Sequence, residues 1–176
     1  MACAITKGRT LPCKNSVGGL KNVYILDYEE DGAAISNLTP SSGTVTLPTD
    51  GTAEFFKFEI KGNSSLETTV ISSRENGTTF YESTLNLTFT YLDVATQEEL
   101  KLLNAGRAHY VVETYNGDYL LIGKEHGAEV TGGTIVTGAA MGDLSGFTLT
   151  VTAQETAPPF FATAPQESGD TIDPDA

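Results

Sequence analysis

Apolar and polar residues alternate over long stretches of this chain, which is the pattern of strands with one buried and one exposed face. The clearest stretch runs from Asn63 to Leu92 and has Asn76-Gly77 at its centre. Asn-Gly favours a two-residue type I′ turn, because that turn needs positive φ at both central positions. With Glu75 opposite Thr78, the two arms predict a long antiparallel ribbon.

This register gives the predicted ribbon two unlike faces. The mostly apolar face, which is expected to pack on a second sheet, holds Leu66, Val70, Leu85, Leu87, Phe89 and Tyr91. The polar and acidic face holds Glu67, Thr69, Ser73, Glu82, Thr84, Asn86, Thr88 and Thr90. Arms of about ten residues would span roughly 33 Å, which favours a surface-building role over an active site.

Further strands are predicted on both sides of the ribbon. The last one, residues 147–154, places a threonine between successive apolar residues, and a second Asn-Gly pair at Asn116-Gly117 marks another hairpin. The predicted strands cover residues 22–28, 52–61, 109–115, 118–124 and 147–154.

One short helix is predicted after Asp93. Thr96 and Glu99 have the spacing of a capping box, and Gly106 is a natural stop. A helix this short needs to dock on a sheet to be stable. Together the elements predict a mainly β fold: an antiparallel β-sandwich or partial barrel with a long hairpin and one short flanking helix.

Charge divides the chain into three parts. Residues 1–21 hold four of the ten basic residues and no acidic one, so a basic N-terminal arm is predicted there. Residues 22–157 form the predicted β-sandwich domain, and residues 158–176 a Pro-rich acidic C-terminal tail. The net charge of −13 repels nucleic acid over most of the surface. The arm is either an ordinary disordered extension or binds an acidic partner, such as another copy of the chain.

The sequence contains no motif for catalysis, a cofactor or a metal. The segment Gly142–Gly146 has the composition of a hydrolase elbow but not its Gly-x-Ser-x-Gly order. His109 and His126 lack a paired histidine, and Cys3 and Cys13 lack further ligands nearby. No apolar run approaches the length of a membrane span. We therefore expect no enzyme activity, no cofactor, no metal and no membrane partner.

The order of the elements, together with two segments, resembles tail tube proteins and related virion proteins of tailed bacteriophages. The segments are Asn116-Gly117-Asp118-Tyr119 and Gly142-Asp143-Leu144-Ser145-Gly146-Phe147-Thr148-Leu149-Thr150, the latter running into Ala157-Pro158. The resemblance covers residues 22–157. It implies a β-sandwich with a flanking helix that assembles into rings, commonly hexamers. The rings stack, and their inner sheets join around a channel for DNA.

The resemblance also implies partners and location. The partners would be copies of the chain and other phage tail proteins, while DNA would pass without specific binding. The protein would be part of the virion, assembled in the cytoplasm of the bacterial host. The polar ribbon face would line the channel, since an acidic, hydroxyl-rich wall stays hydrated and repels phosphates.

Other interpretations remain open at this stage. The ribbon is alternatively an ordinary sandwich arm with its polar face in solvent. The protein is alternatively a head decoration protein, a tail-completion ring or a carbohydrate-binding β-sandwich. The absence of Trp weighs against sugar binding, whereas Tyr81, Tyr91, Tyr115 and Tyr119 favour it.

Overall fold

The computed structural model describes residues 7–28, 35–60 and 62–173. In these ranges the chain forms one large mixed, mostly antiparallel sheet of eleven strands and a short helix, which confirms the predicted fold class. The strands are β1 (Leu20–Asp27), β2 (Thr44–Val45), β3 (Glu54–Glu59), β4 (Ser65–Ser73), β5 (Thr78–Thr90), β6 (Arg107–Thr114), β7 (Tyr119–Ile122), β8 (Ala128–Val136), β9 (Gly146–Glu155), β10 (Phe160–Ala162) and β11 (Gln166–Glu167); the helix is α2 (Val94–Leu103).

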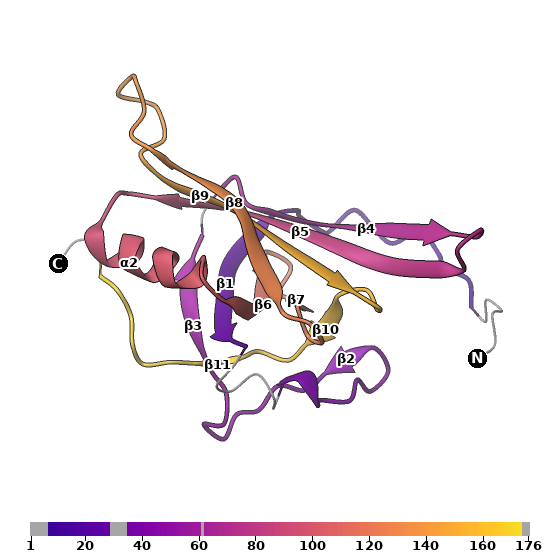
Figure 1. Ribbon diagram of the computed structural model, residues 1–176. Helices are drawn as coiled ribbons and strands as arrows, with labels where there is room; N and C mark the ends of the chain where they lie inside the picture. The colour runs from indigo at the N-terminus through magenta and orange to yellow at the C-terminus, as the bar shows by residue number, and fades with distance from the viewer. Residues whose placement is uncertain (1–6, 29–34, 61, 174–176) are drawn as a thin grey trace.

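The sheet folds over itself into two layers (Figure 1). The upper layer contains β4, β5, β9 and β8 in that order, and the lower layer contains β3, β1, β6 and β7. The layers are continuous because β6 pairs with the first residues of β8, Ala128 and Glu129. Helix α2 lies at one end of the molecule, below β8 and β9, and buries Leu100 in the space between the layers.

Two apolar cores lie on opposite sides of the lower layer. The first, between the layers, includes Leu85 and Val112, and the second, beyond the lower layer, includes Phe55 and Val111. The adjacent residues Val111 and Val112 are both fully buried, so β6 is covered on both faces. Complete burial of such a side chain contributes about 1.5–3 kcal/mol, which makes the lower layer the rigid centre of the fold.

The long ribbon forms, but the predicted turn is wrong. Ser73, not Glu75, pairs with Thr78, so the loop has four residues and the register is shifted by two. Gly77 has a φ of 63°, whereas Asn76 stays outside the positive-φ region that a type I′ turn requires. Because the shift is an even number of residues, the paired side chains keep their predicted faces. Val70 and Tyr91, which were expected to pack on a second sheet, are instead 58% and 55% exposed, and Tyr91 lies beyond the end of β5 with a φ of 75°.

The helix also begins differently from the prediction. Asp93 is the N-cap, and its carboxylate accepts a hydrogen bond from the Thr96 N–H at 2.7 Å. Thr96 therefore lies inside the first turn, and the predicted capping box is wrong. The helix ends at Leu103 with Asn104 as the C-cap, before the predicted stop at Gly106.

Strand β9 confirms the predicted alternation and joins the ribbon to the body. It pairs with β5 over ten residues, and its apolar residues from Phe147 to Ala153 are buried in the first core. At Gly146 a Cβ atom would lie 2.0 Å from the Phe89 carbonyl oxygen of β5. Only glycine fits there without a backbone shift.

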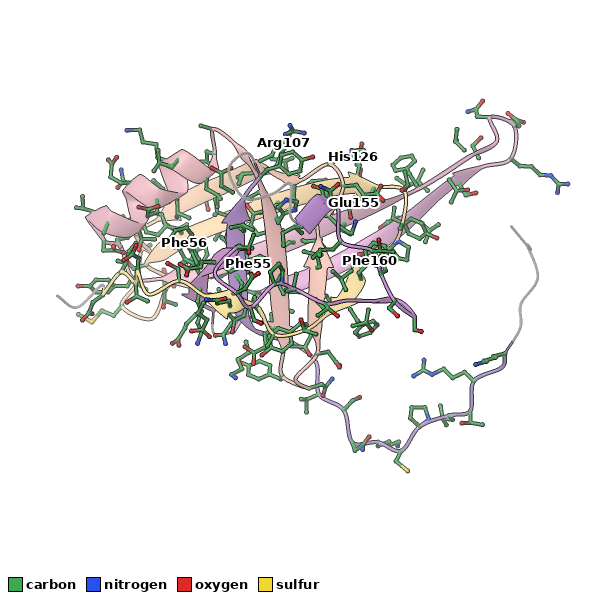
Figure 2. All side chains as sticks on the ribbon, turned by 90° about the horizontal axis from the view of Figure 1, so that it is seen from below. Phe55, Phe56, Arg107, His126, Glu155 and Phe160 are labelled. Atoms are coloured by element: carbon green, nitrogen blue, oxygen red, sulfur yellow. The ribbon has the colours of Figure 1, made fainter. Side chains whose placement is uncertain are left out.

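The Pro-rich segment after Ala157 lies against the body over its described length. Strand β10 pairs with β7 and β2, and β11 pairs with β3. Phe160 packs on the second core, to which Phe55 also belongs (Figure 2). This segment therefore extends the edges of the lower layer, and its residues Phe160 and Ala162 pack against the second core.

Candidate functional site: a polar sheet face

The outer side of the upper layer is a polar surface. In β5 the side chains of Leu85 and Leu87 are buried below the sheet, and the residues between them face away from the core. Direct pairing places Glu67 and Thr152 on either side of Thr84, so polar rows run from β4 through β5 to β9. We call this surface the hydroxyl face; it consists of Ser65, Glu67, Thr69, Glu82, Thr84, Asn86, Thr88, Thr90, Glu129, Thr131, Thr134, Thr148, Thr150, Thr152 and Gln154.

The charge of the hydroxyl face has a single sign. Its charged members are Glu67, Glu82 and Glu129, and none of its members is Lys or Arg. Carboxylates repel phosphate groups, and the hydroxyl groups between them keep the surface hydrated. The face is therefore suited to contact with water and unsuited to holding an anionic polymer.

Side-chain hydrogen bonds run across the hydroxyl face from strand to strand. Gln154 Nε2 donates to Glu82 Oε2 at 2.7 Å, and Thr150 Oγ1 donates to Asn86 Oδ1 at 3.0 Å. Two hydroxyl pairs continue the pattern between β9 and β8, at distances of 3.0 Å (Thr131 and Thr152) and 2.6 Å (Thr134 and Thr148). These hydrogen bonds satisfy some of the polar groups of the hydroxyl face and hold its side chains in ordered rows.

The eight residues predicted from the sequence all lie on one side of the ribbon. Seven of them belong to the hydroxyl face, and the eighth, Ser73, lies further out, beyond the end of β9. Near Ser73 the same side of the ribbon carries Ile71 and Phe80, so the surface there is no longer purely polar. Whether these residues face a channel remains a prediction.

The half of the hydroxyl face that β9 and β8 supply was not predicted from the sequence. The alternation from Phe147 to Gln154 predicted a strand with a threonine face, but nothing local predicted its neighbour. Asn86 and Thr150, which are paired in the structure, are separated by 64 residues in the sequence. A pairing over such a distance leaves no trace in short-range patterns.

The upper layer ends in two edges. Among the residues that the structure describes, β4 pairs with β5 on one side only, and β8 pairs with β6 only through Ala128 and Glu129. From Thr131 to Val136, β9 is the only strand that pairs with β8 in the described part of the chain. Such edges present backbone N–H and C=O groups to which a further strand adds.

Glu113, a buried carboxylate on β6 of the lower layer, fixes the start of β1. Its oxygens accept hydrogen bonds from Lys21 Nζ at 2.9 Å, Asn22 Nδ2 at 2.5 Å and the Tyr24 hydroxyl at 3.2 Å. Burial alone would raise the pKa of Glu113, but the bonds from Lys21 and Asn22 hold it below its ordinary value. The group is therefore ionised and structural.

Glu155, at the end of β9, has a pKa that is shifted in the opposite direction. It is 7% exposed, and its carboxylate accepts the Glu125 N–H at 2.7 Å. Burial raises the pKa of Glu155 in spite of this bond. Arg107 and His126 lie in the same region (Figure 2), where Arg107 Nη1 donates to the His126 carbonyl oxygen at 3.1 Å. These contacts hold the turn between β7 and β8.

The basic arm, predicted as residues 1–21, is described from residue 7 onward. Residues 7–19 are exposed, and this segment extends away from the body (Figure 2). It is attached at Val17, whose N–H and C=O both bond the side-chain amide of Asn116 at 2.9 Å. Lys21 already belongs to β1 and forms the ion pair with Glu113.

The described residues contain no group of three His, Cys, Asp or Glu side chains that could hold a metal ion. In the same ranges, no helix is long and apolar enough to cross a membrane. Cys13 is exposed and free, and Cys3 lies outside the described residues. The chain matches no protein-family model and no curated protein sequence.

Proposed function

We propose that this protein is a structural subunit of the tail tube of a tailed bacteriophage. Copies of the chain form stacked rings, commonly hexamers in such tubes, and their hydroxyl faces together line an acidic channel through which DNA is ejected. One observation carries the proposal: a single four-stranded layer combines an acidic, hydroxyl-rich face with two edges that are open to further strands. The resemblance in the sequence supports the same conclusion.

The chemistry of the hydroxyl face suits a channel wall for DNA. Duplex DNA carries one negative charge per roughly 1.7 Å of its axis and binds to surfaces that offer Lys or Arg, because bound counterions are released. A wall with Glu67, Glu82 and Glu129 and no base offers no such contact. DNA would slide past a layer of water that the hydroxyl groups hold.

The two edges suit a ring. If β4 of one copy lies beside the open edge of β8 in the next copy, the upper layers continue from subunit to subunit. Such a head-to-tail contact closes into a ring when the rotation between copies divides a full circle. The function proposed here needs no catalytic residue and no cofactor, and its partners are copies of the chain and other tail proteins.

The first test is the state of assembly. Size-exclusion chromatography with light scattering, followed by negative-stain electron microscopy at high protein concentration, should show rings and tubes. A chain that stays monomeric at every concentration contradicts the proposal. Single rings without tubes instead favour a head decoration protein or a tail-completion ring.

The second test concerns the channel wall. Tubes carrying Glu67→Lys and Glu82→Lys should retain DNA in a co-sedimentation assay at low salt, and release it as salt is raised. The matched control carries Glu98→Lys and Glu99→Lys on the exposed side of α2, with the same change of charge. Equal retention by both double variants would show that the hydroxyl face is not the wall.

A further inference from the structure

The dipeptide Asn-Gly occurs twice in this chain, each time at the end of a hairpin. Asn76-Gly77 lies in the loop between β4 and β5, and Asn116-Gly117 lies in the turn between β6 and β7. Both asparagines are exposed, and both glycines have positive φ, 63° at Gly77 and 85° at Gly117. Because the two pairs are alike in these respects, a difference in their reactivity has to come from their contacts.

Asn-Gly is a reactive sequence because its asparagine loses the side-chain amide without a catalyst. The backbone nitrogen of the glycine attacks Cγ of the asparagine, and the bond between Cγ and Nδ2 breaks. The proton that the glycine nitrogen loses leaves with the amide group as ammonia. Water then opens the five-membered succinimide ring to aspartate or isoaspartate, with no oxidant or cofactor. Glycine favours ring closure because it has no Cβ atom to hinder the attack.

The side-chain amide of Asn116 is held at both of its polar atoms. Its Oδ1 accepts a hydrogen bond from the Val17 N–H at 2.9 Å, and its Nδ2 donates to the Val17 carbonyl oxygen at 2.9 Å. The attacking nitrogen is held as well, because the Gly117 N–H donates to the Thr114 carbonyl oxygen at 3.0 Å. These three hydrogen bonds oppose ring closure, which has to turn Cγ of Asn116 toward the nitrogen of Gly117.

The loop at the end of the ribbon lacks such restraints. The Asn76 N–H donates to Ser73 Oγ at 3.3 Å, but within the described ranges no hydrogen bond involves the side-chain amide of Asn76 or the Gly77 N–H. A Cβ atom at Gly77 would meet nothing within 4 Å beyond its chain neighbours, so the surroundings of the attacking nitrogen are open. The side chain of Asn76 is therefore free to reach the geometry of ring closure.

We infer that Asn76-Gly77 is a site of spontaneous deamidation, whereas Asn116-Gly117 is protected by its contacts with Val17 and Thr114. This inference goes beyond the proposed function and does not depend on assembly. The reaction places a further carboxylate beside Glu75, and isoaspartate also lengthens the main chain of the loop by a methylene group. The pairing of β4 with β5 ends before this loop begins, so the fold tolerates the product.

At Asn116 the same reaction would disturb the structure. An ionised aspartate has no hydrogen to donate to the Val17 carbonyl oxygen, so one of the two bonds that attach the exposed segment 7–19 at Asn116 would be lost. The segment thus shields the asparagine that holds it, and the reaction is directed to the loop where it does least harm.

Peptide mass spectrometry on the full-length chain, incubated in neutral buffer, measures the loss of amide at each site. In the folded protein Asn76 should react at least about tenfold faster than Asn116, because hydrogen bonds oppose the reaction only at Asn116. The matched control is the same chain unfolded in guanidinium chloride, in which the two sites should react at similar rates. Equal rates in the folded protein, or an undiminished difference in the unfolded chain, would overturn the inference.

Two substitutions should move the two rates separately. Val17→Pro removes the N–H that Asn116 Oδ1 accepts and should accelerate the reaction at Asn116 by about threefold or more, while Asn76 is unaffected. Gly77→Ala adds a methyl group beside the attacking nitrogen and should slow the reaction at Asn76 alone. Leu11→Pro, at a position of the same segment that is 96% exposed, is the control for Val17→Pro.

The outcomes are decisive for each half of the inference. If Leu11→Pro accelerates the reaction at Asn116 as much as Val17→Pro does, or if neither has an effect, the protection by Val17 is refuted. If Gly77→Ala leaves the rate at Asn76 unchanged, ring closure at this site is refuted. Circular dichroism verifies that each variant is folded. None of these results bears on whether the chain forms tubes, so the proposed function is tested separately.

Discussion

The two layers of the sheet differ in how many of their faces are buried. Strands β1 and β6 of the lower layer are covered on both faces, with the first core on one side and the second core on the other. Strands β5 and β9 of the upper layer are covered on one face only, and their other face is the hydroxyl face. The lower layer thus lies between two cores, whereas the upper layer closes one core and presents a surface.

This difference shows where the molecule tolerates change. A strand that is buried on both faces accepts few substitutions, because any loss of volume leaves a cavity. A strand with one wet face keeps half of its side chains free for another purpose at little cost to folding. The hydroxyl face lies on the upper layer, which contributes less to the core. This placement suits a subunit whose polar surface serves an assembly.

The largest predicted effect concerns the lower layer. Phe55→Ala, which opens a cavity in the second core, should lower the free energy of unfolding by about 3–5 kcal/mol. Its neighbour Phe56 lies on the same strand but is 46% exposed, so Phe56→Ala should cost about 1 kcal/mol or less. Urea denaturation of the two variants measures the difference. Similar losses would mean that the second core does not support the lower layer.

The sequence predicted the elements of both layers better than their pairing. The ribbon, α2 and β9 follow local patterns of period two or local capping, and all three are present. The register of the ribbon was missed because Asn76-Gly77 occurs in a four-residue loop as well as in a type I′ turn. Which of the two loops forms depends on how the strands pair, and strand pairing is not a local property.

In the candidate site, too, the faces of the strands were predicted from the sequence, but the pairing of β5 with β9 was not. Alternation alone placed Glu67, Glu82 and four threonines on the same face, namely Thr69, Thr84, Thr88 and Thr90, and the even shift in register left this intact. The threonines of β9 could be recognised as one face of a strand, but not as a continuation of the ribbon. Their placement needed the whole fold, since the apolar residues between them complete the first core.

An intermediate effect is predicted for the two buried carboxylates, Glu113 and Glu155, whose pKa values are shifted in opposite directions. The pKa of Glu113 lies below its ordinary value of 4.5, so its contribution to stability is present above pH 4.5 and is lost as pH falls through the lowered pKa. The pKa of Glu155 is raised above 4.5, so its contribution is present below pH 4.5 and is lost as pH rises through the raised pKa.

Glutamine substitutions should separate these contributions. Glu113→Gln should cost about 1–3 kcal/mol at pH 7, since hydrogen bonds to a buried charge are lost, and should flatten the stability curve below pH 4.5. Glu155→Gln should flatten it above pH 4.5 instead. Urea midpoints measured from pH 3 to pH 8 test both, with Glu59→Gln at an exposed position as the control. Identical curves for the two variants would show that the two carboxylates do not differ in this way.

The smallest predicted effect sharpens the distinction between the two faces of the upper layer. Thr84 lies on the hydroxyl face and the adjacent Leu85 is fully buried. Thr84→Val keeps the β-branched shape and should change the free energy of unfolding of the isolated chain by no more than about 0.5 kcal/mol. Leu85→Ala should cost about 2–5 kcal/mol. If Thr84→Val destabilised the monomer by more than 1 kcal/mol, the hydroxyl face would be part of the folding energetics rather than a surface kept free for a shared channel.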